Sequence, residues 1–120
     1  MNMESLRSYC LAKKHVTESF PFDSDTLVFK VGGKMFALTS LSRQPFSINL
    51  KMDEALVPEW RDRYDDVQPG YHMNKKMWNT VCAGNNSISD KELKWLIDHS
   101  YEEVLKKMSR KKREELLKGL

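Results

Sequence analysis

Two consecutive glycines inside a β-prone segment constrain the fold more strongly than any other feature of this sequence. Residues 26–31 (TLVFKV) are rich in β-branched and aromatic side chains, and Gly32-Gly33 follows them directly. Glycine adopts the positive φ angles of a tight two-residue turn without steric cost, so this pattern predicts a β-hairpin. The chain is then expected to return as a second strand over residues 34–41.

A second turn and a third strand extend this hairpin into a meander. Ser42-Arg43-Gln44-Pro45 forms the expected turn, and residues 46–51 alternate between apolar and polar side chains. The apolar set is predicted to face the core and the polar set the solvent: Phe46, Ile48 and Leu50 inward, Ser47, Asn49 and Lys51 outward. This alternation is typical of an antiparallel sheet with one solvated face.

Helical periodicity flanks the predicted meander on both sides. An opening helix is expected over residues 3–14 with Asn2 as its N-cap, and a short helix containing Pro58 over residues 53–64. Ser89 and Glu92 form an S-x-x-E pattern that predicts the start of a long helix reaching Met108. A further strand over 78–83 and a last helix ending at Leu117 complete the pattern.

This order of elements predicts an α+β fold, in which an antiparallel sheet packs against an N-terminal helix and C-terminal helices. A chain of 120 residues has the length of a single domain, here residues 1–120. Its apolar runs are too short to span a membrane, and its first residues lack the apolar stretch of a signal peptide. We therefore expect a cytoplasmic protein, and a monomer.

Catalytic and metal-binding patterns are weak in this sequence. The histidines His15, His72 and His99 do not have metal-ligand spacing, and Cys10 and Cys82 form no C-x-x-C pair. We therefore expect a protein that is not an enzyme and that requires neither a metal nor an organic cofactor. A spatial pairing of Cys82 with His72 is the remaining catalytic alternative, because a cysteine nucleophile can use a distant histidine.

Positive charge is concentrated near the C-terminus. The formal net charge is only +3, but six cations lie within eight residues: Lys106, Lys107, Arg110, Lys111, Lys112 and Arg113. Glutamates at 102, 103, 114 and 115 are interleaved with them, which is also what a solvated helix face requires. The run therefore has two interpretations, an anion-binding helix or an ordinary solvated surface.

The segment PGYHMNKKMWNTV, residues 69–81, concentrates polar donors in a short loop. Trp78 is predicted to anchor the core, whereas Asn74, Lys75 and Lys76 have two interpretations. Asn74 can stabilise a turn while the lysines are merely solvated. Alternatively, His72 and these three residues form a loop of donors suited to phosphate contacts.

Several of these segments resemble the MmcQ/YjbR family. HMNKKMW after Val67-Gln68-Pro69 is similar to the family's H-[apolar]-N-K-x-x-W segment, which follows a V-x-P turn. Further similarity lies in residues 5–10, 49–51 and 98–101, so the resemblance covers nearly the whole chain. Met77 departs from the pattern, since some relatives have histidine there, and a role that needs two histidines in the loop is not expected.

The resemblance implies a CyaY-like (frataxin-like) fold whose hairpins act as a double-wing DNA-binding motif. We therefore expect duplex DNA as the partner, held through phosphate contacts rather than base-edge readout. The candidate contacts are Lys34, Arg43, Lys51, His72, Asn74, Lys75 and Lys76. Frataxin-like iron handling is disfavoured, because residues 3–14 contain one acidic residue against three basic ones. The main alternative is a protein–protein interaction module, and a weaker one is a small-molecule or enzyme site around His72.

Overall fold

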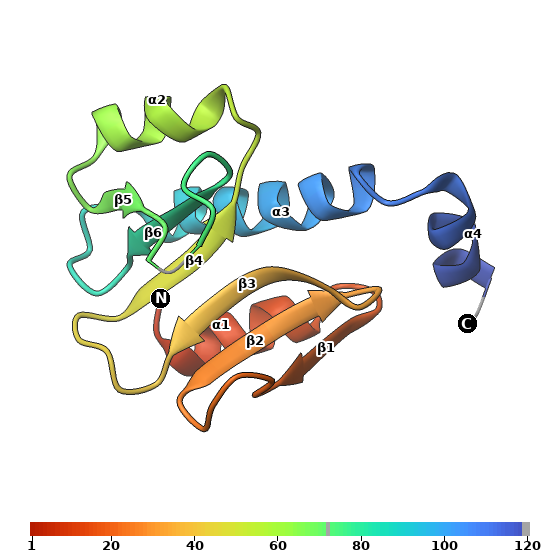
Figure 1. Ribbon diagram of the computed structural model, residues 1–120. Coiled ribbons are helices and arrows are strands. Elements are labelled where there is room, and N and C mark those ends of the chain that lie inside the picture. The colour runs from red at the N-terminus through yellow and green to blue at the C-terminus, as the bar shows by residue number, and fades with distance from the viewer. Residues whose placement is uncertain (72, 119–120) are drawn as a thin grey trace.

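The Gly32-Gly33 pair forms the predicted hairpin turn, with φ angles of 58° and 79°. The structure, a computed structural model, describes residues 1–71 and 73–118 (Figure 1). Its elements are α1 (Met3–Leu11), β1 (Val16–Ser19), β2 (Thr26–Val31), β3 (Lys34–Ser40), β4 (Ser47–Lys51), α2 (Leu56–Arg63), β5 (Val67–Pro69), β6 (Trp78–Cys82), α3 (Asp90–Lys106) and α4 (Arg110–Lys118). The α+β class predicted from the sequence is confirmed.

The strands form one six-stranded antiparallel sheet in the order β1-β2-β3-β4-β6-β5. The predicted three-strand meander is its central part, because β2 pairs with β3 and β3 with β4. The pairing of β3 with β4 is short, since only Ala37 with Leu50 and Leu38 with Asn49 lie opposite each other. Beyond this contact the two strands diverge, as Figure 1 shows.

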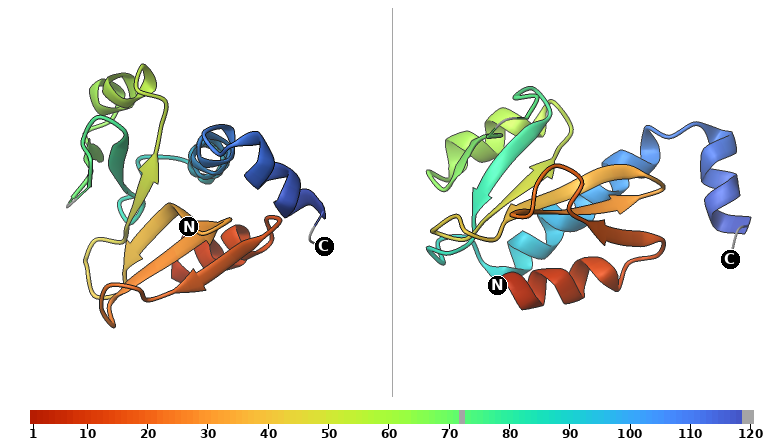
Figure 2. Two further views of the ribbon diagram at one scale, coloured as in Figure 1. Left: turned by 45° about the vertical axis from the view of Figure 1, so that its right-hand side comes forward. Right: turned by 60° about the horizontal axis from the view of Figure 1, so that its bottom comes forward.

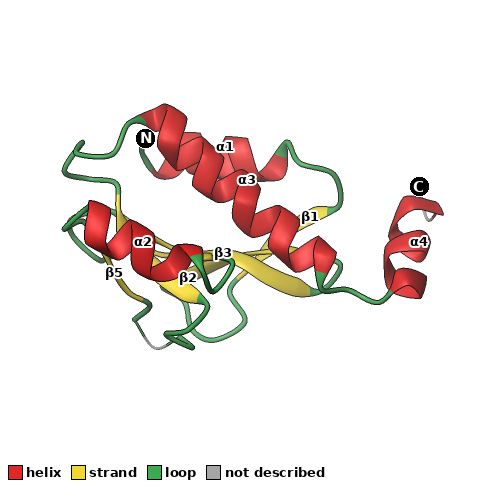
Figure 3. Cartoon of the chain, turned by 90° about the horizontal axis from the view of Figure 1, so that it is seen from above, coloured by secondary structure: helices red, strands yellow, loops and turns green. Residues whose placement is uncertain are grey.

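The main core lies between the sheet and helices α1 and α3, which cover the same face (Figure 3). Apolar side chains from all these elements are fully buried there, among them Leu6, Phe29, Phe36, Ile48, Leu50, Leu93, Leu96 and Ile97. Ser100 of α3 inserts where β3 and β4 diverge. Its hydroxyl accepts a hydrogen bond from the Lys51 N–H (2.9 Å) and donates one to the Phe36 carbonyl (2.5 Å). The Ser100 hydroxyl thus bonds to backbone groups of β3 and β4 that do not bond to each other at this point.

Both predicted N-cap residues, Asn2 and Ser89, are observed, whereas the helix predicted from residue 53 begins only at Leu56. The Asn2 side chain accepts a hydrogen bond from the Ser5 N–H, and the Ser5 hydroxyl accepts one from the Asn2 N–H, a reciprocal cap. At α3 the Ser89 hydroxyl accepts from the Glu92 N–H (3.1 Å). The Glu92 carboxylate, however, accepts from the Ser89 hydroxyl rather than from its backbone N–H. Ser89 is therefore the N-cap, without the full capping box that the sequence predicted.

Helix α4 follows α3 near the tip of the β2–β3 hairpin (Figure 2, left), and its Leu116 packs against the core. A Cβ atom placed on Gly32 would lie 2.8 Å from Leu116 Cδ1 and 2.9 Å from Met108 Cε. Glycine is therefore required here both for its positive φ angle and for this close approach. As a result, the basic C-terminal run lies beside the β2–β3 turn.

Three details of the sequence prediction need correction. The opening helix ends at Leu11 rather than at residue 14, and His15, with a left-handed φ of 65°, then turns the chain into β1. The strands β1 and β5 were not predicted. Both are short strands at the edges of the sheet, where pairing with a neighbour rather than local propensity decides the conformation.

The sheet face away from α1 and α3 is not simply solvated. Val28, Leu38 and Trp78 form a second buried apolar cluster there, with Met35, Met73 and Met77 packed around it. Trp78 is buried as predicted, but it anchors this second cluster rather than the main core. Ser47, predicted to face solvent, is also buried, whereas Asn49 and Lys51 are half-buried. Loop residues, among them Phe22, Arg43 and Tyr71, border the same face beside Ser47 and Asn49.

None of the helices in the described parts of the chain combines the length and the apolar character that crossing a membrane would require.

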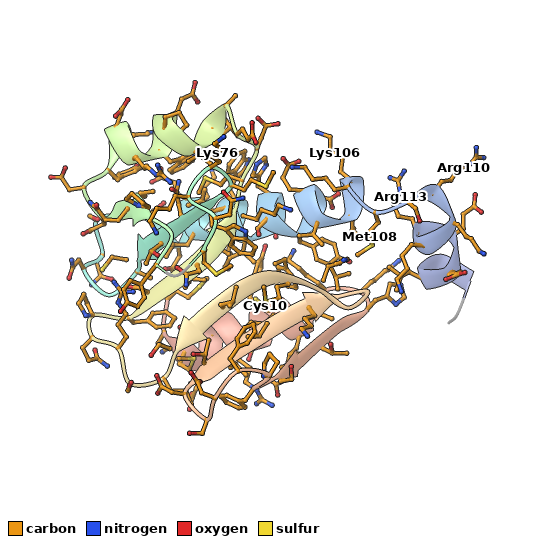
Figure 4. The ribbon with its side chains drawn as sticks, viewed as in Figure 1. Cys10, Lys76, Lys106, Met108, Arg110 and Arg113 are labelled. Carbon is orange, nitrogen blue, oxygen red and sulfur yellow. The ribbon has the colours of Figure 1, made fainter. Side chains whose placement is uncertain are left out.

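The two cysteines differ in their surroundings, which predicts a difference in reactivity. Cys10 lies on α1 inside the core, as Figure 4 shows, and burial raises the pKa of its thiol to about 12. Cys82 is half-buried at the end of β6. In a thiol-reagent assay at mildly alkaline pH, Cys82 is expected to react in the folded protein and Cys10 only after denaturation, because the thiolate is the reactive form. Equal reaction rates for both thiols would contradict this placement of α1.

Candidate nucleic-acid interface

The residues predicted to contact DNA lie in three separate parts of the structure. Lys34 and Lys51 lie at the same end of the meander, beside the β2–β3 turn, whereas Arg43 lies at its other end in the β3–β4 loop. Asn74, Lys75 and Lys76 belong to the loop between β5 and β6. His72, and with it the proposed pairing with Cys82, lies outside the described residues.

Lys51 marks a point where several positive charges meet. Burial lowers the pKa of its ammonium group, and the nearby Lys107 and Lys34 lower it further. Glu103 acts in the opposite direction, but its carboxylate already pairs with Lys106 at 3.6 Å. Over residues 1–71 and 73–118, none of Lys34, Lys51 and Lys107 forms an ion pair with a carboxylate. An anion bound here would relieve the repulsion among the three cations.

Apart from residue 72, the 70–77 loop is held by a defined set of internal hydrogen bonds. The Asn74 side chain accepts a hydrogen bond from the Lys76 N–H (3.0 Å), and its carbonyl accepts from the N–H groups of Met77 and Trp78. Asn74 therefore stabilises the turn, which favours the structural interpretation of this residue. The Lys75 ammonium donates to the Gly70 carbonyl (3.0 Å) and retains two further N–H donors. Lys76 is exposed.

Arg61 of α2 holds this loop in place, a role that the sequence did not indicate. Its guanidinium donates to Asn79 Oδ1 (2.6 Å) and to the carbonyls of Lys75 and Trp78. Asn79 is itself fully buried, and its amide donates to the Val57 carbonyl (3.2 Å). An arginine on an amphipathic helix is normally assumed to be solvated, so no local pattern could have identified this contact.

The C-terminal basic run continues the positive charge beyond the hairpin. Lys106 pairs with Glu103, and Arg110 with Glu114 at 3.2 Å. Figure 4 shows Lys106 at the end of α3 and Arg110 and Arg113 on α4. In the part of the chain that the structure describes, Lys107, Lys111, Lys112 and Arg113 are exposed and form no ion pair with a carboxylate.

Contacts within the fold link the cations around Lys51, the lysines of the 70–77 loop and the C-terminal basic run. The Met52 N–H donates to the Met77 carbonyl (2.8 Å), which links the 70–77 loop to the end of β4 where Lys51 lies. Leu116 and Met108 pack around Gly32, which places α4 beside Lys34. We refer to the following set as the basic surface: Lys34, Lys51, Lys75, Lys76, Lys107, Lys111, Lys112 and Arg113.

Arg43 belongs to a different feature, a groove on the sheet face away from α1 and α3. The groove has a volume of about 1070 Å³ and extends over β2, β3, β4 and β6. The Arg43 guanidinium lies 5.1 Å from the centre of the Tyr71 ring, which places a cation at the rim. Asn74 lines the same groove, so the 70–77 loop borders both the groove and the basic surface.

Two carboxylates, Asp23 and Asp25, also line this groove. Asp23 accepts hydrogen bonds from the N–H groups of Asp25 and Thr26. Asp25 accepts from the hydroxyls of Ser40 and Ser42, and these bonds keep the pKa of both carboxyl groups below its usual value. Both aspartates are thus occupied in holding the loops together. Across the described residues, no group of three or more His, Cys, Asp or Glu side chains could hold a metal ion.

The fold and these surfaces define an α+β protein that has a six-stranded antiparallel sheet, a basic surface and a separate groove on the open face of the sheet. This chain belongs to the YjbR family, whose model matches residues 11–103. The resemblance inferred from the 69–81 segment is therefore confirmed.

Relatives match along almost their whole length. The chain is 34% identical over 116 residues to the protein YbdF of Escherichia coli O157:H7, covering 97% of this chain and 94% of that protein. It is 29% identical to YjbR of Escherichia coli K12, covering 98% of each. Among solved structures, the Deinococcus radiodurans protein DR2400, described as a DUF419 domain, superimposes with a TM-score of 0.89 at 39% identity, covering 96% of this chain and 87% of that one. A Pseudomonas syringae protein superimposes with a TM-score of 0.72 at 28% identity, covering 85% and 97%.

Proposed function

We propose that this protein is a non-enzymatic DNA-binding protein whose basic surface contacts the phosphates of a duplex. The observation that carries the proposal is the cluster of Lys34, Lys51 and Lys107, in which both other ammonium groups repel that of Lys51 and none of the three forms an ion pair with a carboxylate within the described residues. Repulsion within this cluster raises the free energy of the unbound protein, and a bound anion would relieve that repulsion. Neutralising phosphates releases counterions, which supplies most of the affinity of non-specific DNA binding.

Two projecting segments of the basic surface fit the proposed double-wing arrangement. One is the β2–β3 turn with Lys34, supported by α4, and the other is the 70–77 loop with Lys75 and Lys76. The loop is held by Arg61 and by its own turn, so its lysines are presented without a large ordering cost. These groups are point charges and provide no bidentate readout of base edges, so we expect little sequence preference.

The test is a titration with duplex DNA over a range of salt concentrations. Replacing Lys75 and Lys76 together by alanine is expected to weaken binding to all duplexes alike. It should also flatten the log–log salt dependence by about 1.8, because each phosphate contact contributes about 0.9. The fold should survive, since both side chains are exposed.

A matched control uses two exposed lysines outside the basic surface, Lys14 and Lys91. Their double replacement by alanine removes the same net charge and should leave the salt slope nearly unchanged. A wild-type protein that shows no duplex binding even at low salt would overturn the proposal and favour a protein–protein interaction module instead.

A further inference from the structure

The groove on the open face of the sheet has features that phosphate binding does not explain. Two large side chains at this groove are mostly exposed, Phe22 at 64% and Tyr71 at 59%. Its lining also includes Leu38 and Trp78 of the second apolar cluster, together with Met35 and Met73. Aromatic and methionine side chains gathered at one concave surface are characteristic of a binding site.

The position of the groove argues against an extended peptide as its occupant. It lies over β2, β3, β4 and β6, which are inner strands of the six-stranded sheet. A peptide that binds a sheet as an extra strand needs an unpaired edge, and the edges here are β1 and β5. An occupant of this groove must therefore bind through side-chain contacts and stacking rather than through backbone hydrogen bonds.

The rim of the groove supplies the combination of groups that unpaired bases use. The Arg43 guanidinium lies over the Tyr71 ring, and both planar groups can stack on a base. Asn49 and Asn74 bring amide groups to the lining; their oxygens accept hydrogen bonds from Thr80 and Lys76, and their NH2 groups can donate to base edges. Lys75 and Lys76 follow Asn74 in the same loop, where they can contact the phosphates that join successive bases.

Charged side chains are unevenly placed around the groove. Asp23 and Asp25 make one part of the groove negative, although hydrogen bonds from backbone and hydroxyl groups occupy their carboxylates. Arg43 directly follows Ser42, which binds Asp25, so it offsets this negative charge, and phosphates would be attracted most strongly to Lys75 and Lys76 of the 70–77 loop. The charge of the rim thus complements a strand whose backbone follows the 70–77 loop and whose bases turn inward.

We propose that the groove binds a short single-stranded nucleic-acid segment, with bases stacked on Tyr71 and Phe22 and the backbone along Arg43, Lys75 and Lys76. The inference rests on the proposed nucleic-acid function and extends it, because it assigns unpaired bases to the groove, while Lys75 and Lys76 of the basic surface would contact phosphates in both kinds of complex. Stacking on aromatic rings tolerates any base, so the segment need not have a particular sequence.

The test compares labelled oligothymidylate with an abasic strand of the same length, which has the same phosphates but no bases. The wild-type protein is expected to bind oligothymidylate about tenfold or more tightly than the abasic strand. Tyr71→Leu, which keeps apolar bulk but removes the ring, should lose about tenfold in affinity for oligothymidylate. The conservative Tyr71→Phe should bind within about twofold of wild type, and Phe22→Leu should weaken binding in the same direction as Tyr71→Leu.

Duplex binding measured on the same variants separates this inference from the proposed function. Tyr71→Leu should leave duplex affinity within about twofold of wild type, because phosphate contacts carry that binding. If duplex binding persists but the abasic strand binds as well as oligothymidylate, or Tyr71→Leu has no effect, the groove assignment is wrong and the proposed function stands. If oligothymidylate binds in a Tyr71-dependent manner and duplex DNA does not bind, the groove assignment stands and the proposed duplex binding is wrong.

Two further measurements identify the occupant of the groove. Substituting oligouridylate for oligothymidylate distinguishes an RNA from a DNA strand as the preferred source of bases, since only the sugar and one methyl group differ. An apolar peptide that binds in a Tyr71-dependent manner, with no binding of either oligonucleotide, would overturn the inference and assign the groove to a protein partner.

Discussion

Replacing Leu96 with alanine is expected to lower the free energy of unfolding by about 2–5 kcal/mol. Leu96 is fully buried on α3, in the core between that helix and the sheet. Truncation removes its transfer free energy and leaves a cavity that the surrounding strands cannot fill, because Ser100 fixes α3 to both β3 and β4. Chemical denaturation followed by circular dichroism measures the change.

An exposed leucine supplies the matched control. Leu41, in the β3–β4 loop, is 43% exposed, so Leu41→Ala makes the same chemical change where little apolar area is buried. We expect a loss within about 1 kcal/mol for this variant. If Leu96→Ala cost no more than Leu41→Ala, the face of α3 assigned to the core would be wrong.

Features set by local physics could be predicted from the sequence. The β2–β3 hairpin follows from Gly32-Gly33, since these residues adopt the positive φ angles that the turn requires. The start of α3 follows from Ser89, whose hydroxyl caps the first free N–H groups of the helix. In both cases the decisive contact joins residues a few positions apart, so a short window of sequence contains it.

The face of the sheet opposite the helices was harder to predict, although a signal was present. Leu27, Val28 and Phe29 are consecutive and all buried, a run that is typical of a strand covered on both faces. The clean alternation in residues 46–51 suggested one solvated face for the whole sheet. That pattern describes one strand only, and Val28 with Leu38 and Trp78 forms an apolar cluster on the supposedly solvated face.

The grouping of lysines in the basic surface could not be predicted from the sequence. Lys34, Lys51 and Lys107 come from β3, β4 and the end of α3, and they meet only because β3 and β4 diverge while α3 runs across the gap. The sequence shows Lys107 only as part of a basic run along the chain. Conversely, the sequence groups Arg43 with these lysines, but Arg43 lies at the other end of the meander beside Tyr71.

The largest effect on binding is expected when Lys34, Lys51 and Lys107 are all replaced by glutamine. Three phosphate contacts would be lost, so the log–log salt slope should flatten by about 2.7, and duplex affinity at about 0.1 M salt should fall by roughly two to three orders of magnitude. Folding should not suffer, because the Lys51 backbone N–H still donates to Ser100 and the repulsion among the three ammonium groups is removed.

Net charge alone could also weaken DNA binding, so the control must change it equally. Replacing the exposed lysines Lys14, Lys91 and Lys94 by glutamine lowers the formal charge from +3 to 0, as the first variant does, but leaves the basic surface intact. If the three basic-surface lysines contact phosphates, the control should retain most of the wild-type affinity and salt slope. Equal losses in the two variants would mean that overall charge drives association, and the assignment of a defined duplex-binding surface would then be wrong.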